Sequence, residues 1–363
     1  MKKIISVVGA RPNFMKVAPL HRQLAQHPGQ FEHMICHTGQ HYDEMMSKVF
    51  FDDLELPRPD FSLGVGSGSH TEQTARIMIE FEKIVLSEKP DAVIVVGDVN
   101  STVACTLVAV KSGIPVAHVE AGLRSFDRTM PEEINRVMTD AVADYLFVTE
   151  RSGVDNLKNE GVPERKIFFV GNTMIDSLLR YKEKSDRSAV LSRLKIHPQH
   201  YALVTLHRPR NVDSPDELRK IVLMLNAVGE KMKVVFPVHP RTKNNLTAAA
   251  LLQQFSSNVL LTEPAGYIDF LALLKNASVV VTDSGGVQEE TTFLGIQCIT
   301  ARENTERPST LLTGTNRLAG TNWDTVRDAA FDVLSGNIKN GTIPELWDGR
   351  ASERIVSILQ STI

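Results

Sequence analysis

The sequence predicts an α/β fold of two Rossmann-like, doubly wound domains that face each other across a cleft. Short runs rich in Val and Ile recur along the chain, and they are continuously apolar, as in parallel strands covered on both faces. Longer stretches with helical spacing, such as 72–88 and 215–232, lie between them. The series pauses at 172–198, where the charged segment YKEKSDRS precedes a new start at Tyr201.

The expected strands form two series. In the first half of the chain they are IISVV (4–8), HMICHTG (33–39), AVIVVGD (92–98), PVAHVEAG (115–122), YLFVTE (145–150) and IFFVG (167–171). In the second half they are YALVTLH (201–207), KVVFPVHP (233–240), NVLLTEP (258–264), SVVVTDSGG (278–286) and QCITAR (297–302). We therefore place the domain boundary near Gly171, with one domain at 1–171 and the other at 172–350.

The composition excludes several classes of function. With 40 Lys and Arg against 43 Asp and Glu, the formal charge of −3 offers no global basic field for nucleic acid. Three widely spaced cysteines, Cys36, Cys105 and Cys298, show neither a disulfide framework nor metal-ligand spacing, which fits a reducing compartment. The apolar run before Arg11 is too short for a signal peptide, and no stretch is long enough to span a membrane. We expect a soluble, cytoplasmic protein without nucleic-acid or membrane partners.

Polar residues and glycines stand at the carboxyl ends of six of the expected strands. They are Gly9-Ala10-Arg11-Pro12, Gly97-Asp98, Glu120-Ala121-Gly122, His207-Arg208, His239-Pro240 and Asp283-Ser284-Gly285-Gly286. Any single one could be a polar residue satisfied within its loop. Because ligands of parallel α/β sheets bind beyond the carboxyl ends of the strands, six such positions together predict one ligand site.

The stretch PVAHVEAGLRSFDRTMPEEINR (115–136) concentrates opposed charges where a strand gives way to a loop. Its carboxylates and arginines are Glu120, Asp127, Glu132 and Glu133, and Arg124, Arg128 and Arg136. Two interpretations of the arginines stay open: they orient the carboxylates, or they form plain surface ion pairs. His118, inside the apolar run, is most simply a core histidine.

Two glycine-containing turns lead to different expectations. GARPNFMK places Arg11 where a dinucleotide-binding fold needs small residues, so NAD is not expected. In DSGGVQEE (283–290), two glycines at the start of a helix let backbone N–H groups approach a phosphate, and Ser284 adds a hydroxyl. The alternative is a tight strand–helix turn with an N-cap. If the turn binds a phosphate, Glu290 is placed to hold the ribose of the same nucleotide, and Arg307 is a second candidate phosphate ligand.

The eleven histidines do not predict a metal site. His37 and His41 are separated by Thr-Gly-Gln, which is typical of a loop, and no His–carboxylate cluster emerges. We expect neither a metal nor a redox cofactor.

These segments together resemble the non-hydrolysing UDP-N-acetylglucosamine 2-epimerase family along nearly the whole chain. The resemblance rests on GARPNFMKVAPL, HTGQHYDEMMS, VVGDVNSTVA, IPVAHVEAGLRS, MPEEINR, VGNTMIDSLL, TLHRPRN, PVHPRT, TDSGGVQEE, TERP and GTNRL. It implies the GT-B architecture of many nucleotide-sugar glycosyltransferases, with UDP held by the C-terminal domain. It also implies that a C-terminal helix, 351–363, returns to the first domain. The expected partner is a UDP-sugar, and we expect a homodimer.

The resemblance also implies the roles of individual residues. It makes acid/base groups of Asp98, Glu120 and Glu132, and it places His207 beside the diphosphate. The implied substrate contacts are Arg11, Lys16, Arg136, His239, Phe270, Ser284, Gly285, Gly286, Glu290 and Arg307. Bacterial members that need a UDP-sugar activator carry Arg-Gln where this chain has Ser69-His70, which favours an enzyme that needs no activator.

The implied reaction interconverts UDP-GlcNAc and UDP-ManNAc. The hydrogen on C2 is not next to a carbonyl, so direct deprotonation faces a prohibitive barrier. Loss of UDP from C1 acidifies that hydrogen, elimination gives a 2-acetamidoglucal, and UDP re-adds with protonation from the opposite face. The alternatives are an epimerase for UDP-2,3-diacetamido-2,3-dideoxyglucuronate, a hydrolysing epimerase, a GT-B glycosyltransferase and a UDP-sugar sensor without turnover. The paired acids Glu120 and Glu132 argue against a glycosyltransferase.

Overall fold

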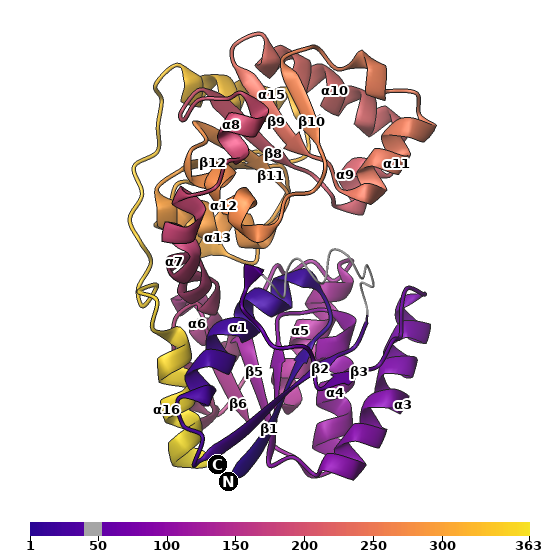
Figure 1. Cartoon of the computed structure of the whole chain (residues 1–363), viewed down its shortest axis with the longest axis vertical. Helices are drawn as coiled ribbons and strands as arrows, with labels where there is room; N and C mark the ends of the chain where they lie inside the picture. The colour runs from indigo at the N-terminus through magenta and orange to yellow at the C-terminus, as the bar shows by residue number, and fades with distance from the viewer. Residues whose placement is uncertain (40–52) are drawn as a thin grey trace. The chain divides into compact units, whose positions relative to one another are not determined.

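The computed structural model describes residues 1–39 and 53–363, except for the side chain of Arg11. His41 and most of the HTGQHYDEMMS motif lie outside the described residues. The chain divides into two compact units (Figure 1). The first unit contains Met1–Leu179 and Glu345–Ile363, and the second contains Arg180–Pro344. One of the two connections between the units lies within helix α7 (Thr173–Asp186).

The first unit contains a parallel sheet with the order β3-β2-β1-β4-β5-β6-β7 among the residues described. Its strands are β1 (Lys2–Val8), β2 (Phe31–His37), β3 (Phe61–Ser62), β4 (Ala92–Val96), β5 (Val116–Ala121), β6 (Tyr145–Val148) and β7 (Ile167–Phe169). In the described part of this unit, the helices besides α7 are α1 (Arg11–Ala25), α3 (His70–Glu88), α4 (Asn100–Lys111), α5 (Pro131–Val142), α6 (Arg151–Asn159), η1 (Glu164–Lys166) and α16 (Ala351–Thr362). All five residues of β4, AVIVV, are buried, as expected for a central strand covered on both faces.

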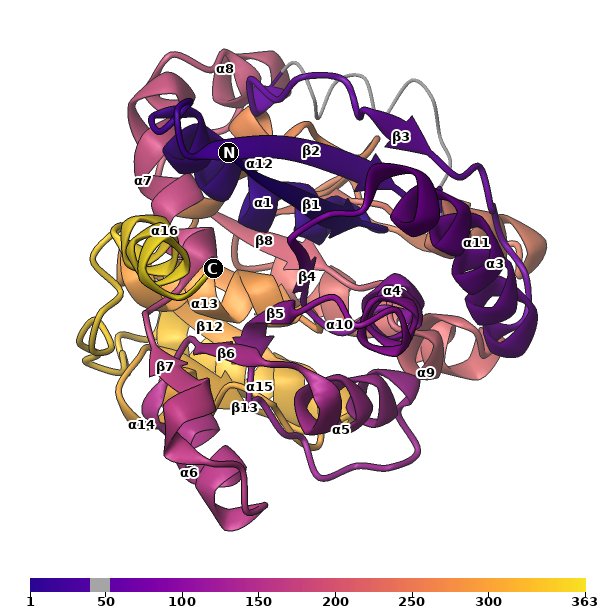
Figure 2. The ribbon, with the colours of Figure 1, turned by 90° about the horizontal axis from the view of Figure 1, so that it is seen from below.

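Helices cover both faces of this sheet. Figure 2 shows α3, α4 and α5 on one side and α16 on the other. α16 packs against α1, and its buried apolar side chains include Ile355 and Leu359. Asp176 of α7 accepts hydrogen bonds from the backbone N–H groups of Ala351 (3.1 Å) and Ser352 (2.7 Å), so it satisfies the first turn of α16.

The second unit contains a parallel sheet with the order β10-β9-β8-β11-β12-β13. Its strands are β8 (Tyr201–Thr205), β9 (Lys233–Pro237), β10 (Val259–Thr262), β11 (Val279–Thr282), β12 (Gln297–Thr300) and β13 (Asn316–Leu318). Its helices are α8 (Val190–Leu194), α9 (Pro209–Val212), α10 (Pro215–Gly229), α11 (Pro240–Ala248), η2 (Leu252–Gln254), α12 (Tyr267–Lys275), α13 (Gly285–Leu294), α14 (Pro308–Leu312) and α15 (Trp323–Leu334).

Both sheets have the strand order of the doubly wound fold. Counted along the chain within each unit, the order is 3-2-1-4-5-6, and the first sheet adds β7 at one edge. The direction of winding reverses between β1 and β4 in the first sheet and between β8 and β11 in the second. Ligands of such sheets bind outside the carboxyl ends of the strands at these switch points. The residues that follow these four strands are therefore the first candidates for a site.

The predicted α/β class and the two doubly wound units are confirmed. Each of the eleven expected strands is present with shifted ends, and α3 and α10 occupy the stretches expected to be helical. The two edge strands β3 and β13 were not predicted, because they are two and three residues long and are not continuously apolar. No helix in the described part of the chain is long and apolar enough to cross a bilayer.

Candidate functional site

At the switch point of the first sheet, a single amide ties two strand ends together. Asn13, in the first turn of α1, accepts hydrogen bonds at Oδ1 from the N–H groups of Gly9 (3.1 Å) and Ala10 (2.9 Å). Its Nδ2 donates to the carbonyl oxygen of Val96 at the end of β4 (3.1 Å). Asn13 was not predicted, because its role depends on a contact with a strand 83 positions away.

Lys16 and Glu120 form a buried ion pair beside this switch point. The pair packs over Gly97, where an added Cβ would lie 3.0 Å from Lys16 Nζ and 3.4 Å from Glu120 Oε2. Gly97 also has a φ of +67°, so it combines a close approach with a backbone conformation that favours glycine. The structure thus brings together two of the predicted residues at the end of β4.

Glu120 itself has an unusual backbone. Its φ is +74°, in the left-handed region that non-glycine residues seldom occupy. The pairing register of β5 with β6 shifts between Val119 and Ala121, so Glu120 is the extra residue of a bulge. Its side chain is only 3% exposed. Such strain persists only where the surrounding structure imposes it, and it is common at functional sites.

Asp98 is held by helix α5. Arg136 donates from Nη1 to Asp98 Oδ2 (2.6 Å) and from Nη2 to Glu133 Oε2 (2.6 Å). Asn135 Nδ2 donates to the backbone oxygen of Asp98 (2.9 Å). These bonds fix the first turns of α5 to the end of β4. Glu132 is half-buried in the first turn of α5, where the helix dipole favours a negative charge.

Behind these groups lies a buried cluster that connects both strand ends. Asp140 Oδ1 lies 2.6 Å from His118 Nδ1, and Asp140 Oδ2 accepts from Arg124 Nη1 (2.7 Å) and from the N–H of Gly122 (3.0 Å). His118 Nε2 lies 2.8 Å from the carbonyl oxygen of Gly97. Burial would raise the pKa of Asp140, but the interactions with His118 and Arg124 outweigh it and lower this pKa. The prediction that His118 is a core histidine is confirmed, and its two polar contacts link β4 to β5.

The burial of the arginines decides between the two interpretations of 115–136. Arg124 and Arg136 are 3% and 2% exposed, and each binds two carboxylates. Surface pairing is therefore the wrong interpretation for these two, while Arg128 is exposed. Arg136 orients Asp98 directly, and Arg124 supports the turn that follows Glu120.

At the switch point of the second sheet, a buried carboxylate organises the turn after β8. Asp283 accepts hydrogen bonds from the backbone N–H groups of His207 (3.0 Å) and Arg208 (2.9 Å) and from Asn211 Nδ2 (3.0 Å). Its Oδ1 also lies 2.9 Å from His207 Nδ1. Arg208 Nε donates back to the carbonyl oxygen of Asp283 (2.9 Å). Asp283 was predicted only as one of the polar residues at the strand ends, and its contacts with the turn after β8 were not predicted.

His239 stands near His207 at the same edge of the sheet. It caps the N-terminus of α11, where its Nδ1 accepts from the N–H of Arg241 (3.2 Å). The ring centroids of His207 and His239 are 6.3 Å apart. Two imidazoles thus follow the neighbouring strands β8 and β9.

The N-terminus of α13 forms the adjacent turn. Ser284 is the N-cap residue, and its N–H donates to Thr282 Oγ1 (3.0 Å). A Cβ on Gly285 would lie 2.5 Å from Arg307 Nη1 and 2.8 Å from Glu306 Oε1, so only glycine fits there. Arg307 is buried, and its Nε lies 2.9 Å from Glu289 Oε1 while Nη1 pairs with Glu306. The guanidinium of Arg307 therefore packs directly against the backbone of Gly285, and it already binds the carboxylates of Glu289 and Glu306.

Glu290 and Phe270 complete the predicted residues of this unit. Tyr267 of α12 donates a hydrogen bond to Glu290 Oε1 (3.0 Å). Burial raises the pKa of Glu290 to about 8, with a further contribution from Glu289, and the Tyr267 hydrogen bond opposes the rise only in part. Phe270 lies half-buried on α12, one turn after Tyr267.

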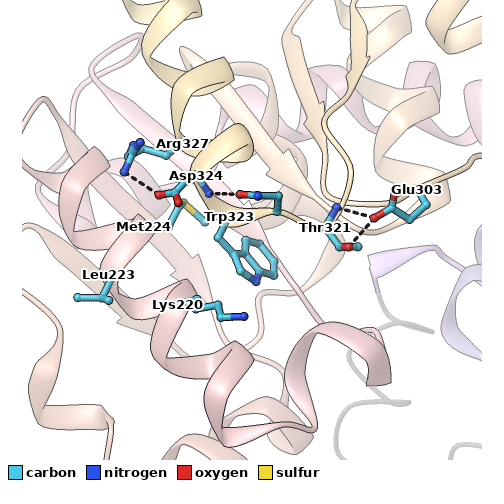
Figure 3. Close-up of a pocket in the computed structure, with 9 residues that line it drawn as sticks. Lys220, Leu223, Met224, Glu303, Thr321, Trp323, Asp324 and Arg327 are labelled. Atoms are coloured by element: carbon cyan, nitrogen blue, oxygen red, sulfur yellow. Dashed lines mark hydrogen bonds and ion pairs between the residues drawn. The ribbon is translucent and has the colours of Figure 1, made fainter.

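A separate surface pocket of about 700 Å³ lies on the second unit by α10 and α15 (Figure 3). Its polar groups bind one another: Glu303 accepts from the N–H of Thr321 (3.1 Å), and Arg327 donates to Asp324 (2.9 Å). None of the predicted site residues is among the described residues that line it. The pocket is therefore not part of the candidate site.

The structure sorts the predicted residues into two groups, one at the carboxyl edge of each sheet. The first contains Lys16, Asp98, Glu120, Glu132 and Arg136, and the second contains His207, His239, Phe270, Ser284, Gly285, Gly286, Glu290 and Arg307. Arg11 is the first residue of α1, but its side chain lies outside the described residues. Among the residues described, no group of three or more His, Cys, Asp or Glu side chains could hold a metal ion.

Comparison with known proteins places this architecture in one family. The family model described as UDP-N-acetylglucosamine 2-epimerase matches residues 22–360. A UDP-N-acetylglucosamine 2-epimerase of Methanocaldococcus jannaschii is 44% identical over 98% of each chain. A UDP-2,3-diacetamido-2,3-dideoxy-D-glucuronate 2-epimerase of Pseudomonas aeruginosa is 40% identical over 98% of this chain and 99% of the relative.

A solved structure agrees with this assignment. The crystal structure of the Methanocaldococcus jannaschii UDP-GlcNAc 2-epimerase in complex with UDP-GlcNAc and UDP has a TM-score of 0.92 at 44% identity. The match covers 99% of this chain and all of the other. This agreement confirms the predicted fold class.

Proposed function

Because the chain belongs to the UDP-N-acetylglucosamine 2-epimerase family, we propose that it is an isomerase that interconverts UDP-GlcNAc and UDP-ManNAc. The observation that carries the proposal is the chemistry at the two switch points. The first sheet presents the carboxylates Asp98 and Glu120, each held by a buried cation. The second presents His207 and the N-terminus of α13, groups suited to a diphosphate.

The proposed reaction proceeds by elimination and re-addition. The bond between C1 and the diphosphate oxygen breaks, its electron pair leaves with UDP, and the proton on C2 passes to a carboxylate of the first unit. The resulting 2-acetamidoglucal receives a proton at C2 from the opposite face, and UDP re-forms the bond to C1. Asp98, Glu120 and Glu132 are the proposed acid/base groups, because inversion at C2 needs proton transfer on both faces of the ring.

The second unit is the proposed UDP-binding unit. The Ser284 hydroxyl, the backbone N–H groups of Gly285 and Gly286 and the field of α13 would stabilise the charge that the diphosphate gains when it departs. Glu290 is the proposed ribose contact and Phe270 a contact of the nucleotide. Arg307 would contribute to substrate binding indirectly, because it packs against Gly285 and holds the turn in place.

In the first unit, Lys16, Arg136 and Arg11 are the proposed contacts from the carboxylate side. Lys16 and Arg136 are both buried against carboxylates, so their first role is to fix Glu120 and Asp98. His239, beside His207, is the proposed further contact in the second unit.

A second candidate substrate is favoured by the Pseudomonas aeruginosa relative. That relative is a 2-epimerase of a UDP-diacetamido uronic acid, and this reaction needs the same proton transfers at C2. The two substrates differ at C3, which adjoins C2, and at C6, but the bonds that break at C1 and C2 are the same. Incubation of the pure protein with each UDP-sugar separately, followed by proton NMR, would decide between them.

The experiment that tests the proposal measures epimerisation in conservative variants. Asp98→Asn, Glu120→Gln and Glu132→Gln keep the side-chain shape and remove proton-transfer capacity, so each should lower kcat by on the order of 10²–10⁴-fold. UDP affinity, measured by calorimetry, should change far less. Glu72→Gln, in an exposed ion pair on α3, is the matched control and should retain the parental rate. Parental rates in all three site variants would refute the assignment.

We also propose that the protein is a cytoplasmic homodimer that needs no activator. Its three cysteines are buried free thiols, which suits a reducing compartment.

The proposed dimer interface lies on α3 and α5. Their exposed apolar side chains, namely Ile79, Leu86, Val137 and Met138, offer a face for a second copy. Ser69 caps α3 at the position where activator-dependent bacterial members carry the arginine, and its hydroxyl accepts from the N–H of Glu72 (3.2 Å), so it cannot supply that cation. Light scattering would give the mass, and reaction progress without a lag from UDP-ManNAc alone would support independence from an activator.

A further inference from the structure

His207 and Asp283 leave the second sheet side by side. β8 and β11 are neighbours, and Thr205 pairs in register with Thr282. The His207 side chain is 46% exposed, whereas Asp283 is fully buried. A ligand at this edge would therefore meet the imidazole, and the carboxylate would hold that imidazole from the protein side.

The position of a hydrogen on the His207 ring can be inferred from the ionisation of Asp283, its partner. Burial would raise the pKa of Asp283, but the charge of His207 and the hydrogen bonds from His207, Arg208 and Asn211 outweigh burial and lower this pKa. Asp283 is therefore ionised at neutral pH and can only accept hydrogen bonds. His207 Nδ1, at 2.9 Å from Asp283 Oδ1, must carry a hydrogen, and Nε2 is the nitrogen left for a ligand.

Support of the turn alone does not require this ring contact. The backbone N–H groups of His207 and Arg208 and the amide of Asn211 already satisfy Asp283 and fix the turn after β8. The bond to Nδ1 adds nothing to the path of the chain. It holds a hydrogen on Nδ1 and orients the exposed imidazole.

We propose that Asp283 is a positioning residue for His207, which it holds with Nδ1–H on the carboxylate so that Nε2 donates a hydrogen bond to a diphosphate oxygen of the leaving UDP. This inference rests on the proposed function. As the bond to C1 breaks, its electron pair passes to the diphosphate, and the hydrogen bond from Nε2 stabilises that charge. With hydrogen on both nitrogens the ring is an imidazolium, and Asp283 offsets its charge. The other polar groups that face this position are Arg208, His239 and the N-terminus of α13.

The first test is a double-mutant cycle on turnover. Asp283→Asn keeps the shape but removes the charge that offsets an imidazolium, so the ring loses a hydrogen and stabilises the departing diphosphate less. We expect kcat to fall by on the order of 10²–10³-fold and UDP affinity to fall as well, because Nε2 contacts the same diphosphate in UDP. In the His207→Gln background the same change should cost no more than about threefold, because Asp283 acts through the ring. Asn211→Ala removes a hydrogen bond to the same carboxylate and leaves the ring contact, so it should lower stability with kcat within about threefold of the parent. Equal losses for Asp283→Asn in both backgrounds would overturn the inference.

The second test needs neither substrate nor a folded variant at position 283. The ring nitrogens of 15N-histidine-labelled protein are observed by NMR, with His207 assigned from its absence in His207→Gln. We expect a protonated Nδ1 at His207; an unprotonated Nδ1 would overturn the inference. Since this spectrum is recorded without turnover, failure of the proposed reaction and failure of the Asp283–His207 arrangement can be told apart.

Discussion

At the scale of single residues, Glu120 combines a buried charge with a strained backbone. Its left-handed conformation should cost a non-glycine residue on the order of 1–2 kcal/mol relative to glycine. Glu120→Gly and Glu120→Ala both remove the carboxylate and leave Lys16 without this partner. The difference between them therefore isolates the backbone. In urea unfolding, we expect Glu120→Gly to be more stable than Glu120→Ala by about 1 kcal/mol. An alanine variant that is equally stable would show that the bulge carries no strain.

Glu290 makes stability depend on pH. The folded state holds its proton up to about pH 8, whereas the unfolded chain loses it near the ordinary pKa of 4.5. Stability from this group is therefore fully present below pH 4.5 and declines as pH rises through about 8. Glu290→Gln cannot ionise, so its free energy of unfolding relative to the parent should increase with pH over this range, by up to about 1.4 kcal/mol per unit. Thermal or urea unfolding between about pH 5 and 9 measures this.

The exposed variant Glu72→Gln serves as the control for the pH series. Its difference from the parent should stay constant between about pH 5 and 9, since Glu72 lies in an exposed pair on α3. A difference for Glu290→Gln that is likewise constant would mean that Glu290 is ionised in the folded protein.

At the scale of elements, the start of α13 depends on glycine for packing rather than for φ. A methyl group at Gly285 would collide with Arg307, which is itself fixed by Glu289 and Glu306. We expect Gly285→Ala to displace the turn, weaken UDP binding at least about tenfold and lower the melting temperature. Gly29→Ala is the control, because a Cβ at Gly29 meets open space. Parental UDP affinity in Gly285→Ala, measured by calorimetry, would exclude this turn as the phosphate site.

The central strands and the long helices were the part of the fold that could best be predicted from the sequence. Central strands such as β4 are covered on both faces, so their residues form continuous apolar runs that periodicity detects. The edge strands β3 and β13 lack that burial and left no such pattern. The strand ends that carry Gly97-Asp98 and Asp283-Ser284 were likewise predictable, because polar residues interrupt the apolar runs there.

The supporting residues of the site were not predictable, for a physical reason. Asn13, Asp140 and Asp283 act through contacts with residues 83, 22 and 76 positions away, and local sequence carries no record of such pairs. His118 illustrates the same limit: an apolar run predicts its burial but not the carboxylate and the carbonyl oxygen that its nitrogens meet. Roles assigned by resemblance supplied candidates, and the structure supplied their partners.

At the scale of the whole molecule, the net charge of −3 does not attract a UDP-sugar, which is an anion. Binding must therefore come from local groups. In the second unit these are the N-terminus of α13 and His207, whose Nδ1 lies 2.9 Å from a carboxylate oxygen of Asp283. In the first unit the cations Lys16 and Arg136 are already matched by carboxylates, which leaves that unit suited to proton transfer more than to anion binding. Under the proposed function, the second unit would therefore bind the leaving UDP and the first would supply the groups that transfer the proton at C2.

The exchange of hydrogen at C2 tests this account most directly. The pure protein is incubated with UDP-GlcNAc in D2O without added NAD, and both the UDP-ManNAc formed and the UDP-GlcNAc recovered are analysed by proton NMR and mass spectrometry. If C2 loses its proton to a carboxylate while UDP remains bound, both sugars should gain one deuterium at C2. Epimerisation that leaves the original hydrogen at C2 would contradict the mechanism.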